Sequence, residues 1–338
     1  MSQRIAMAAP AAGGQVAYAV TGSGPPLVYV SGWLGHLERG WALPAERAFY
    51  EALADGRKLI RYDKPGTGLS PAREGAGEYT LEDELDALRA VVAAAGVERF
   101  DLMGISLGAP VAAAWAALEP GSVRRLVLYG GWARGADIAS PEIRGHVLGL
   151  VRQHWGLGSD LLTDVFAPDA DAVTRAAFAR YQREAADADT AHAMLGLAYR
   201  IDVLDLLPRI GAPTLVVHRL RDRAAPVEQG RRLAGGIAHA RFEAVAGRSH
   251  LPYIGDTRPV TSLIRQFLGL PGRHRGAGPT LTARQREVAA LIAAGSTNRE
   301  IGERLGITER SAEAHVERIR ARMGFRSRAQ IAAWWAAN

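Results

Sequence analysis

Residues 99–108 read Arg-Phe-Asp-Leu-Met-Gly-Ile-Ser-Leu-Gly, and this stretch decides the fold. Its apolar run predicts a strand over Arg99–Met103, and the following text predicts a helix over Leu107–Leu118. Between the two lies Gly104-Ile105-Ser106-Leu107-Gly108. Glycines two positions before and after the serine allow a sharp, strained turn that exposes its hydroxyl. Ser106 is therefore a candidate nucleophile.

The first 270 residues alternate short β-rich runs with helical stretches, which predicts βα units and a largely parallel sheet. A further helix is expected over Thr80–Ala95. Between Arg134 and Asp205 the strand signals stop, so this segment is expected to form helices inserted over one edge of the sheet. The other predicted strands are Val16–Val20, Leu27–Ser31, Lys58–Tyr62, Leu126–Tyr129, Thr214–His218 and Arg241–Val245.

Two later residues could complete a hydrolytic site with Ser106. Asp222 lies four residues after the strand that ends at His218, and His250 lies beyond the next strand. Such loops at the carboxyl ends of strands gather the site of a parallel sheet. A serine hydroxyl needs a base to take its proton, and the imidazole needs a carboxylate to hold its tautomer. The order Ser106, Asp222, His250 predicts a catalytic triad; the alternatives are a turn serine and two unrelated surface groups.

Residues 15–268 resemble the α/β-hydrolase superfamily. Besides the turn at Ser106, Tyr62-Asp63-Lys64-Pro65-Gly66-Thr67-Gly68-Leu69-Ser70 is similar to the Asp-x-x-Gly-x-Gly-x-Ser loop of that family. One departure is Ser31-Gly32, where the family usually has His-Gly. The oxyanion hole is predicted at the backbone N–H groups of Leu107 and Trp33.

This resemblance implies an α/β-hydrolase sheet with a helical cap insertion at about residues 134–205. Trp155, Phe178 and Tyr199 of the insertion are expected to help line the pocket. Serine at the turn, rather than aspartate, argues against epoxide hydrolysis or dehalogenation. The candidate activity is a serine hydrolase acting on carboxylic esters or lactones. Some hydrolase-fold proteins resemble receptors more than catalysts, so turnover stays open at this point.

Residues 270–279 read Leu-Pro-Gly-Arg-His-Arg-Gly-Ala-Gly-Pro, which is too rich in glycine and proline for regular structure. This text predicts a linker between a hydrolase-like sensor domain over residues 1–269 and a second domain over residues 280–338. Residues 271–338 contain 12 basic and 6 acidic side chains, whereas residues 1–270 contain 29 of each. Clustered positive charge is the footprint of phosphate binding, although it can also serve solubility alone.

Residues 280–338 predict an all-α domain of four helices. Thr282-x-x-Gln285 and Thr297-x-x-Glu300 match the capping box that begins a helix, and Gly295 and Gly306 mark breaks. Thr308 can cap the third helix. An apolar stripe runs along that helix at Ala312, Val316, Ile319 and Met323, and a row of donors lies on a neighbouring flank at Ser311, His315, Arg318 and Arg322.

The text from Leu281 to Ile307 is similar to the LuxR-type helix-turn-helix family. It includes Leu281-Thr282-x-Arg284-x-Arg286-Glu287-Val288 and Ala294-Gly295-x-Thr297-Asn298-x-Glu300-Ile301. The resemblance implies that the third helix enters the major groove and that the last, around Arg328–Ala336, mediates contacts in a homodimer. The predicted DNA-facing residues are Thr297, Asn298, Thr308, Arg310, Ser311, Glu313, His315, Arg318 and Arg322.

Glu313 and Glu317 stand where many members of that family carry basic or small residues. A glutamate can accept a hydrogen bond from cytosine N4, but it also repels phosphate. The alternative is an adaptor or dimerisation unit that does not bind DNA.

Composition narrows the remaining classes. The chain has 338 residues, 48% of them hydrophobic and 22% charged, as in ordinary globular proteins of about two domains. It contains no cysteine, which excludes disulfides, thiolate metal sites and a cysteine nucleophile. We expect no metal and no cofactor. Neither a signal peptide nor a membrane span is indicated, so a cytoplasmic protein is expected.

Together these patterns predict a ligand-responsive transcriptional regulator that binds double-stranded DNA. The pocket at Ser106 is expected to capture or hydrolyse a small apolar ester, lactone or similar carbonyl compound. Two rival interpretations remain: a working serine hydrolase, and a catalytically dead hydrolase fold kept as a scaffold for dimers.

Overall fold

The computed structural model describes the whole chain except residues 12, 73–77, 271–280, 324, 326 and 337–338. The chain divides into two compact units, Met1–Gly272 and Arg273–Asn338. Apart from Leu270, the predicted linker 270–279 lies outside the described residues.

The first unit is built on an eight-stranded sheet with strand order β1-β2-β4-β3-β5-β6-β7-β8. The pairs β1–β2 and β2–β4 are antiparallel, and all other neighbouring pairs are parallel. The prediction of a largely parallel sheet is thus confirmed. The strands are β1 Gln3–Ala8, β2 Val16–Thr21, β3 Pro26–Val30, β4 Lys58–Tyr62, β5 Phe100–Ile105, β6 Val123–Tyr129, β7 Thr214–Arg219 and β8 Ala240–Val245.

Strand β1 is the one that the sequence did not predict. It forms one edge of the sheet, and five of its six side chains are exposed or only half-buried. An edge strand of this kind needs neither a continuous apolar run nor strict alternation, so its sequence carries a weak signal. Strand β5 is its opposite, because all six of its residues are buried.

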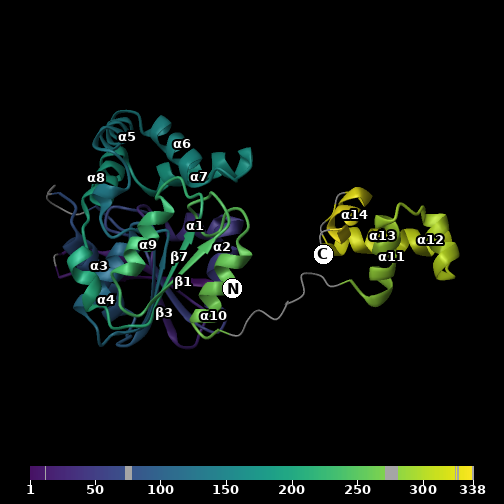
Figure 1. Ribbon diagram of the computed structural model, residues 1–338, viewed down its shortest axis with the longest axis horizontal. Coiled ribbons are helices and arrows are strands. Elements are labelled where there is room, and N and C mark those ends of the chain that lie inside the picture. The colour runs from purple at the N-terminus through teal and green to yellow at the C-terminus, as the bar shows by residue number, and fades with distance from the viewer. Residues whose placement is uncertain (12, 73–77, 271–280, 324, 326, 337–338) are drawn as a thin grey trace. The chain divides into compact units, whose positions relative to one another are not determined.

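Helices cover both faces of the sheet (Figure 1). Helices α3 (Leu81–Ala94) and α4 (Gly108–Leu118) pack together on one face, and α4 contacts β5 and β6. Nearly every residue of α4 is buried, as expected of a helix that is apolar all round. The remaining helices of this layered body are α1 Leu37–Ala42, α2 Pro44–Ala54, α9 Val227–Gly235 and α10 Arg258–Phe267.

A helical cap is inserted between β6 and β7, as the sequence predicts. Its four α-helices lie together at one end of the first unit (Figure 1). Ser140, Asp171 and Asp187 each cap the first turn of a cap helix by accepting a backbone N–H. The cap comprises η1 Gly135–Asp137, α5 Pro141–Gln153, α6 Trp155–Phe166, α7 Ala172–Ala185, α8 Ala188–Arg200 and η2 Leu204–Arg209.

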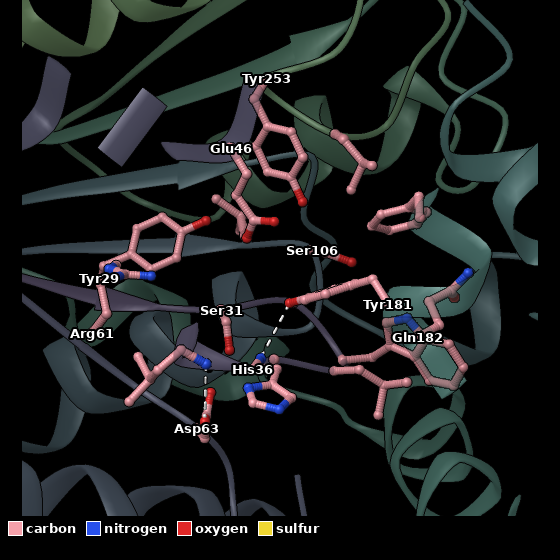
Figure 2. A pocket seen from close by; sticks show the side chains of 18 of the residues that line it. Tyr29, Ser31, His36, Glu46, Arg61, Asp63, Ser106, Tyr181, Gln182 and Tyr253 are labelled. Atoms are coloured by element: carbon pink, nitrogen blue, oxygen red, sulfur yellow. Dashed lines mark hydrogen bonds between the residues drawn. The ribbon is translucent and has the colours of Figure 1, made fainter. Parts of the chain in front are cut away.

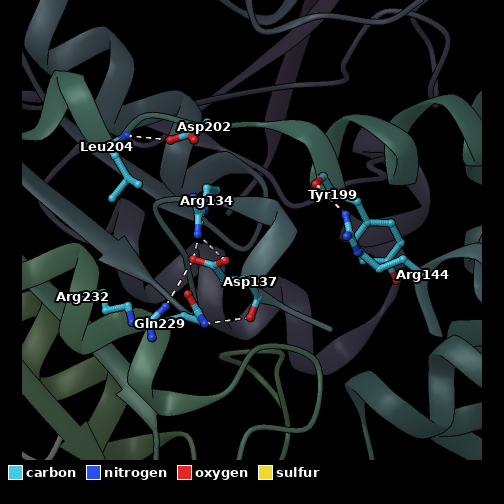
Figure 3. Close-up of polar contacts among 8 residues, drawn as sticks. All are labelled: Arg134, Asp137, Arg144, Tyr199, Asp202, Leu204, Gln229 and Arg232. Carbon is cyan, nitrogen blue, oxygen red and sulfur yellow. Dashed lines mark hydrogen bonds and ion pairs between the residues drawn. The ribbon is translucent and has the colours of Figure 1, made fainter. Parts of the chain in front are cut away.

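The two ends of the cap meet at a small polar cluster, which we call the cap base (Figure 3). An isolated antiparallel bridge joins Arg134 to Asp202. Arg134 donates to both carboxylate oxygens of Asp137, at 3.1 and 2.8 Å. Arg232 of α9 also binds the Asp137 carboxylate, and Gln229 of α9 donates to the Asp137 carbonyl at 2.9 Å. The entry and exit of the cap are therefore tied to the same place on the body.

The second unit is the predicted four-helix domain. Its helices are α11 Ala283–Ala293, α12 Asn298–Leu305, α13 Glu309–Met323 and α14 Arg328–Ala336. Both predicted capping boxes are present, at the starts of α11 and α12, and Gly306 ends α12 with φ +66°. The stripe residues Ala312, Val316 and Ile319 are buried in the core of this unit. No helix in the described part of the chain has the length and apolarity to cross a membrane.

Candidate active site

The turn at Ser106 has the strained geometry that its flanking glycines predict. Ser106 has φ +53°, the only positive φ at a non-glycine residue in the described part of the chain. A Cβ on Gly104 would lie 2.1 Å from the carbonyl oxygen of Gly108, and one on Gly108 would lie 2.3 Å from that of Val30. Only glycine fits at either position, and the serine hydroxyl is held beyond the end of β5.

Ser106, His250 and Asp222 are joined in a chain of hydrogen bonds. His250 Nε2 lies 2.8 Å from Ser106 Oγ, and His250 Nδ1 lies 2.8 Å from Asp222 Oδ2. Because the Asp222 carboxylate can only accept, it favours the tautomer with the proton on Nδ1. The lone pair on Nε2 then faces the serine hydroxyl, which is the arrangement a general base requires.

The surroundings of Asp222 keep it ionised. Burial opposes its ionisation, but the adjacent His250 and the N–H groups of Ala224 and Ala225 outweigh that effect and hold the pKa of Asp222 below its ordinary value. His218 Nε2 lies 3.6 Å from Asp222 and 2.9 Å from the carbonyl oxygen of Ala225. Burial lowers the pKa of His218, so this second histidine is neutral and leaves Asp222 to His250.

The predicted oxyanion-hole residues flank the serine. A Cβ on Gly32 would lie 3.4 Å from Ser106 Cβ, so the loop that carries Trp33 runs beside the nucleophile. Leu107 directly precedes α4, where N–H groups are free and the helix dipole is positive. Neither the Trp33 nor the Leu107 N–H has an acceptor among the described residues. Both groups are thus available to a ligand oxygen.

The loop from Asp63 to Ser70 supports the segment between Ser31 and Leu37 through hydrogen bonds. Asp63 Oδ2 accepts from the N–H groups of Leu37 at 3.1 Å and Leu69 at 2.9 Å, and Ser70 Oγ donates to the Asp63 carbonyl at 2.7 Å. Burial raises the pKa of Asp63 to about 6, although the two backbone donors oppose that shift. A Cβ on Gly68 would lie 2.2 Å from the Asp63 carboxylate, which explains the glycine. The motif therefore holds the loop between Ser31 and Leu37 in place.

Helix α13 of the second unit carries most of the predicted DNA-facing residues. Arg310, Glu313 and Arg318 are exposed, whereas Ser311 and His315 are half-buried. Neither Arg310 nor Arg318 forms an ion pair with another described residue. Burial lowers the pKa of His315, and the positive charges of Arg318 and Arg284 lower it further. Arg322 also lies on α13, but its side chain is not among those that the structure describes.

The other predicted DNA-facing side chains also brace the second unit itself. Thr297 caps α12 and bonds the carboxylate of Glu300. Thr308 accepts the N–H of Ser311 at 3.2 Å and shares a hydrogen bond with its hydroxyl at 2.8 Å. Asn298 Oδ1 accepts from Arg328 at 2.7 Å. The predicted set thus divides into capping or bracing groups and exposed charged groups.

Comparison with known proteins settles the families. A family model described as alpha/beta hydrolase fold matches residues 25–257. The chain belongs to this family. A second model, described as bacterial regulatory proteins of the luxR family, matches residues 279–335. The hydrolase domain is thus followed by a LuxR-type helix-turn-helix domain, a fusion that supports a DNA-binding regulator.

Individual relatives resemble the hydrolase domain. The pyrrolizixenacetamide deacetylase of Xenorhabdus hominickii is 30% identical over 261 residues, covering 75% of this chain and 94% of its own. The 2-hydroxymuconate semialdehyde hydrolase of Pseudomonas sp. strain CF600 is 30% identical over 265 residues, covering 73% and 88%. A solved thermophilic esterase from Thermogutta terrifontis superposes with a TM-score of 0.64 at 27% identity, covering 79% and 98%.

Two cavities of the hydrolase domain meet at Ser106 and share Trp33, Phe166 and His250 as walls. The first, which we call the cap cavity, has a volume of about 170 Å³ and lies under the cap helices. Its walls are mostly apolar and include Ile143, Val147, Leu161, Leu162, Val165 and Leu195. Of the aromatic residues predicted to line the pocket, Tyr199 lines this cavity, Phe178 lines the second cavity, and Trp155 packs edge-on against Trp33 at 5.8 Å.

The second cavity, which we call the polar cavity, is small, with a volume of about 50 Å³ (Figure 2). Five of its polar side chains are Tyr29, Glu46, Tyr50, Arg61 and Tyr253. None of these five side chains was predicted as part of a site, because they come from four separate segments of the chain. Glu46 stands in the first turn of α2, where an acidic residue is ordinary, so its sequence gave no signal of a site.

Proposed function

We propose that this protein is a ligand-responsive, DNA-binding transcriptional regulator whose hydrolase domain cleaves a small ester or lactone. The observation that carries the proposal is the hydrogen-bonded chain Ser106–His250–Asp222, which faces a covered cavity in a chain that also carries a LuxR-type domain. An intact chain of this kind favours turnover over a dead scaffold.

The proposed reaction begins with attack of Ser106 Oγ on the ligand carbonyl carbon. His250 Nε2 takes the serine proton as the carbon–oxygen bond forms, and Asp222 stabilises the resulting imidazolium. The carbonyl oxygen becomes an oxyanion, which the N–H groups of Trp33 and Leu107 would bind. Collapse of this intermediate breaks the bond to the leaving alkoxide, which takes the proton from His250. Water then releases the acyl group by the same steps.

The cap cavity supports an apolar arm on the ligand. Its walls come chiefly from α5, α6 and α8, and aliphatic side chains predominate among them. The names of the compared proteins describe a deacetylase, a semialdehyde hydrolase and an esterase, and these names are compatible with attack on a carbonyl group. We therefore place esters and lactones first among the candidate ligands.

Phe166 offers a route by which a ligand could move the cap. This residue at the end of α6 packs against the His250 ring, with centroids 5.6 Å apart, and against Trp33 at 6.2 Å. Its carbonyl also accepts the backbone N–H of His250 at 2.8 Å. A ligand in either cavity contacts Phe166, so occupancy and cap position are expected to depend on each other.

For the second domain we propose binding to duplex DNA as a homodimer, with α13 in the major groove. Exposed Arg310 and Arg318 would bind phosphate or bases, and the half-buried Trp334 and Trp335 of α14 are candidates for the dimer contact. Two recognition helices would then need a spacing of about 34 Å to enter successive major grooves.

The test is to select bound fragments from genomic DNA and then titrate a selected fragment with two forms of the full chain. One form is free, and the other is modified at Ser106 by an alkyl phosphonate that mimics the tetrahedral intermediate. Because coupling between sites is typically 5–150-fold, we expect the two affinities to differ by at least about fivefold. Ser106→Ala, treated in the same way, is the control for modification elsewhere.

Each arm of this test can contradict one part of the proposal. Absence of DNA binding at low salt would contradict the role as a DNA-binding regulator. Absence of phosphonate at Ser106 would contradict the proposed hydrolase activity. Equal affinities with an unchanged oligomeric state would leave a hydrolase and a DNA-binding domain that do not communicate.

A further inference from the structure

The polar cavity concentrates buried polar atoms that have no partner. Tyr29 Oη, Ser31 Oγ, Glu46 Oε2 and Arg61 Nε are all buried, and none makes a hydrogen bond of ordinary geometry within the described part of the chain. Tyr50 lies close enough to Tyr29, and Tyr253 close enough to Glu46, to affect their pKa values. All four side chains line the polar cavity, which is one of the two cavities that Ser106 lines. An unpaired buried polar group costs about 1–3 kcal/mol, so such a cluster requires an explanation.

Packing fixes these groups rather than leaving them to turn away. Tyr50 donates to the other oxygen of Glu46, and a Cβ on Gly40 of α1 would lie only 3.0 Å from the Glu46 carboxylate. The Tyr29 and Tyr50 rings meet edge to face at 5.4 Å, and the Arg61 guanidinium lies 3.8 Å from the Tyr50 ring centroid. Figure 2 shows the carboxyl of Glu46 near the hydroxyls of Tyr29 and Tyr253.

The charges of the cluster disfavour a cationic ligand group. Arg61 and Glu46 are each 3% exposed, and burial raises the pKa of Glu46 to about 7, so a ligand ammonium would meet a buried guanidinium without a fully ionised carboxylate to offset it. A ligand carboxylate can only accept hydrogen bonds, so it would leave the acceptor oxygen of Glu46 without a partner. The unpaired atoms include both donors and an acceptor: hydroxyls at Tyr29 and Ser31, an N–H at Arg61 and a carboxyl oxygen at Glu46.

We propose that the polar cavity is a subsite for a hydroxyl group on the ligand, which donates to Glu46 Oε2 and accepts from Tyr29 or Ser31. The ligand would then be a hydroxy-substituted ester or lactone, with its apolar arm in the cap cavity and its hydroxyl-bearing arm in the polar cavity. The inference deepens the proposed function and rests on it, since it assumes that the ligand carbonyl sits at Ser106.

The experiment compares 4-nitrophenyl esters of straight-chain acids that end in a hydroxyl with matched esters that end in a methyl group. The acyl chain is lengthened one methylene at a time, from about five to about eight carbons. Two further series of esters end in an ammonium or a carboxylate. At the best chain length we expect kcat/KM for the hydroxyl ester to exceed that for its methyl partner by about tenfold, the effect of one or two net hydrogen bonds.

Variants then assign the preference to the polar cavity. Tyr29→Phe and Glu46→Gln should each reduce the ratio of hydroxyl to methyl substrate, and the ratio within one protein corrects for any general loss of activity. Tyr79→Phe is the matched control, because Tyr79 is a buried tyrosine that bonds Glu84 and lines neither cavity. It should leave the ratio unchanged.

A ratio near one at every chain length would overturn the subsite, as would better turnover of an ammonium or carboxylate series. If the protein turns over no ester, calorimetric binding of hydroxyl- and methyl-ended methyl ketones to the full chain gives the same ratio without catalysis. A tenfold preference in binding would then support the subsite although the hydrolase proposal had failed, and equal binding would overturn both.

Discussion

The two functional regions of this protein present their side chains in opposite ways. In the hydrolase domain, Asp222 and His250 are buried and each is held by at least two hydrogen bonds. On α13, Arg310 and Arg318 are exposed, and within the described part of the chain Arg318 bonds only its own helix, at the carbonyl of Ala314. The first region is organised in advance for one geometry, whereas the second offers charge that can adapt to a surface. Chemistry needs the former, and phosphate attraction can use the latter.

The largest effect should come from breaking the buried chain of hydrogen bonds. Ser106→Ala is expected to lower kcat for an activated ester by a factor of about 10⁴ or more, and His250→Ala by several powers of ten, because nucleophile and base act as a unit. Steady-state kinetics together with mass spectrometry of the acylated serine measure both.

Ser122→Ala is the matched control, since Ser122 bonds Trp115 and lines neither cavity. Full activity in Ser106→Ala, or an acyl group on another serine, would show that the triad is assigned wrongly.

Salt concentration should also distinguish the two regions, with a smaller effect than the substitutions at Ser106 and His250. If two arginines from each copy of a dimer bind phosphate, raising salt from 50 to 200 mM should weaken DNA binding by about a hundredfold through counterion release. Ester hydrolysis by the same protein should change little, because its charges are buried and poorly screened. Fluorescence anisotropy and an esterase assay in the same buffers test the contrast.

Arg318→Ala should reduce the salt slope by about one for each copy bound. Salt-independent DNA binding, or a slope that Arg318→Ala leaves unchanged, would contradict the assignment of this residue to phosphate.

Acidity should affect the buried region through Glu46. Its pKa is about 7 when folded but 4.5 ordinarily, so between these values the folded state keeps a proton that the unfolded chain has released. Stability should therefore fall as pH rises through this window, by about 3 kcal/mol or more than about a hundredfold, and stay low above it. Burial raises the pKa values of Tyr50 and Tyr253 well above this range. Asp63, whose folded pKa is about 6, adds a similar fall in stability at lower pH.

Glu46→Gln should remove the contribution of Glu46 while keeping an acceptor for Tyr50. Urea unfolding of both proteins at pH 5 and pH 8 gives the comparison. Parallel stability curves for the variant and the parent would mean that Glu46 is ionised throughout.

The smallest effect is expected at a helix cap of the exposed region. Thr297→Ala removes the hydroxyl that accepts the N–H of Glu300 and should destabilise the second unit by about 1 kcal/mol. Thr297→Ser keeps the cap and tests the methyl group alone. If both variants bind DNA less well but only alanine lowers the melting temperature, the methyl group contacts DNA; if serine behaves as wild type in both assays, Thr297 acts only as a cap.

The sequence predicted what is decided locally. The strand, turn and helix around Ser106, the capping boxes at Thr282 and Thr297, and the helical cap all follow from residues close together in the chain. The meeting of Asp222 and His250 with Ser106 followed from strand order, because loops at the same edge of a parallel sheet converge.

Features that packing decides were not predicted. Edge strand β1 has a single β-branched residue, Ile5, and no aromatic one, so its sequence does not mark it as a strand, and it is defined by its pairing with β2. The polar cavity brings together Tyr29 from β3, Glu46 and Tyr50 from α2, Arg61 from β4 and Tyr253 from a late loop. The sequence around each of these residues gives no sign that its side chain faces a cavity. Each could equally be an ordinary tyrosine or charged residue of a helix, a strand or a loop.

The cap base has a consequence for how such a protein could change during evolution. Because the cap leaves and rejoins the body at one bridge, Arg134 to Asp202, the chain between them forms a closed excursion. Exchanging that segment for the cap of a relative would renew most of the walls of the cap cavity while leaving the sheet, the strained serine turn and the DNA-binding domain as they are. A regulator built in this way can come to respond to a different ligand by replacement of this one continuous segment.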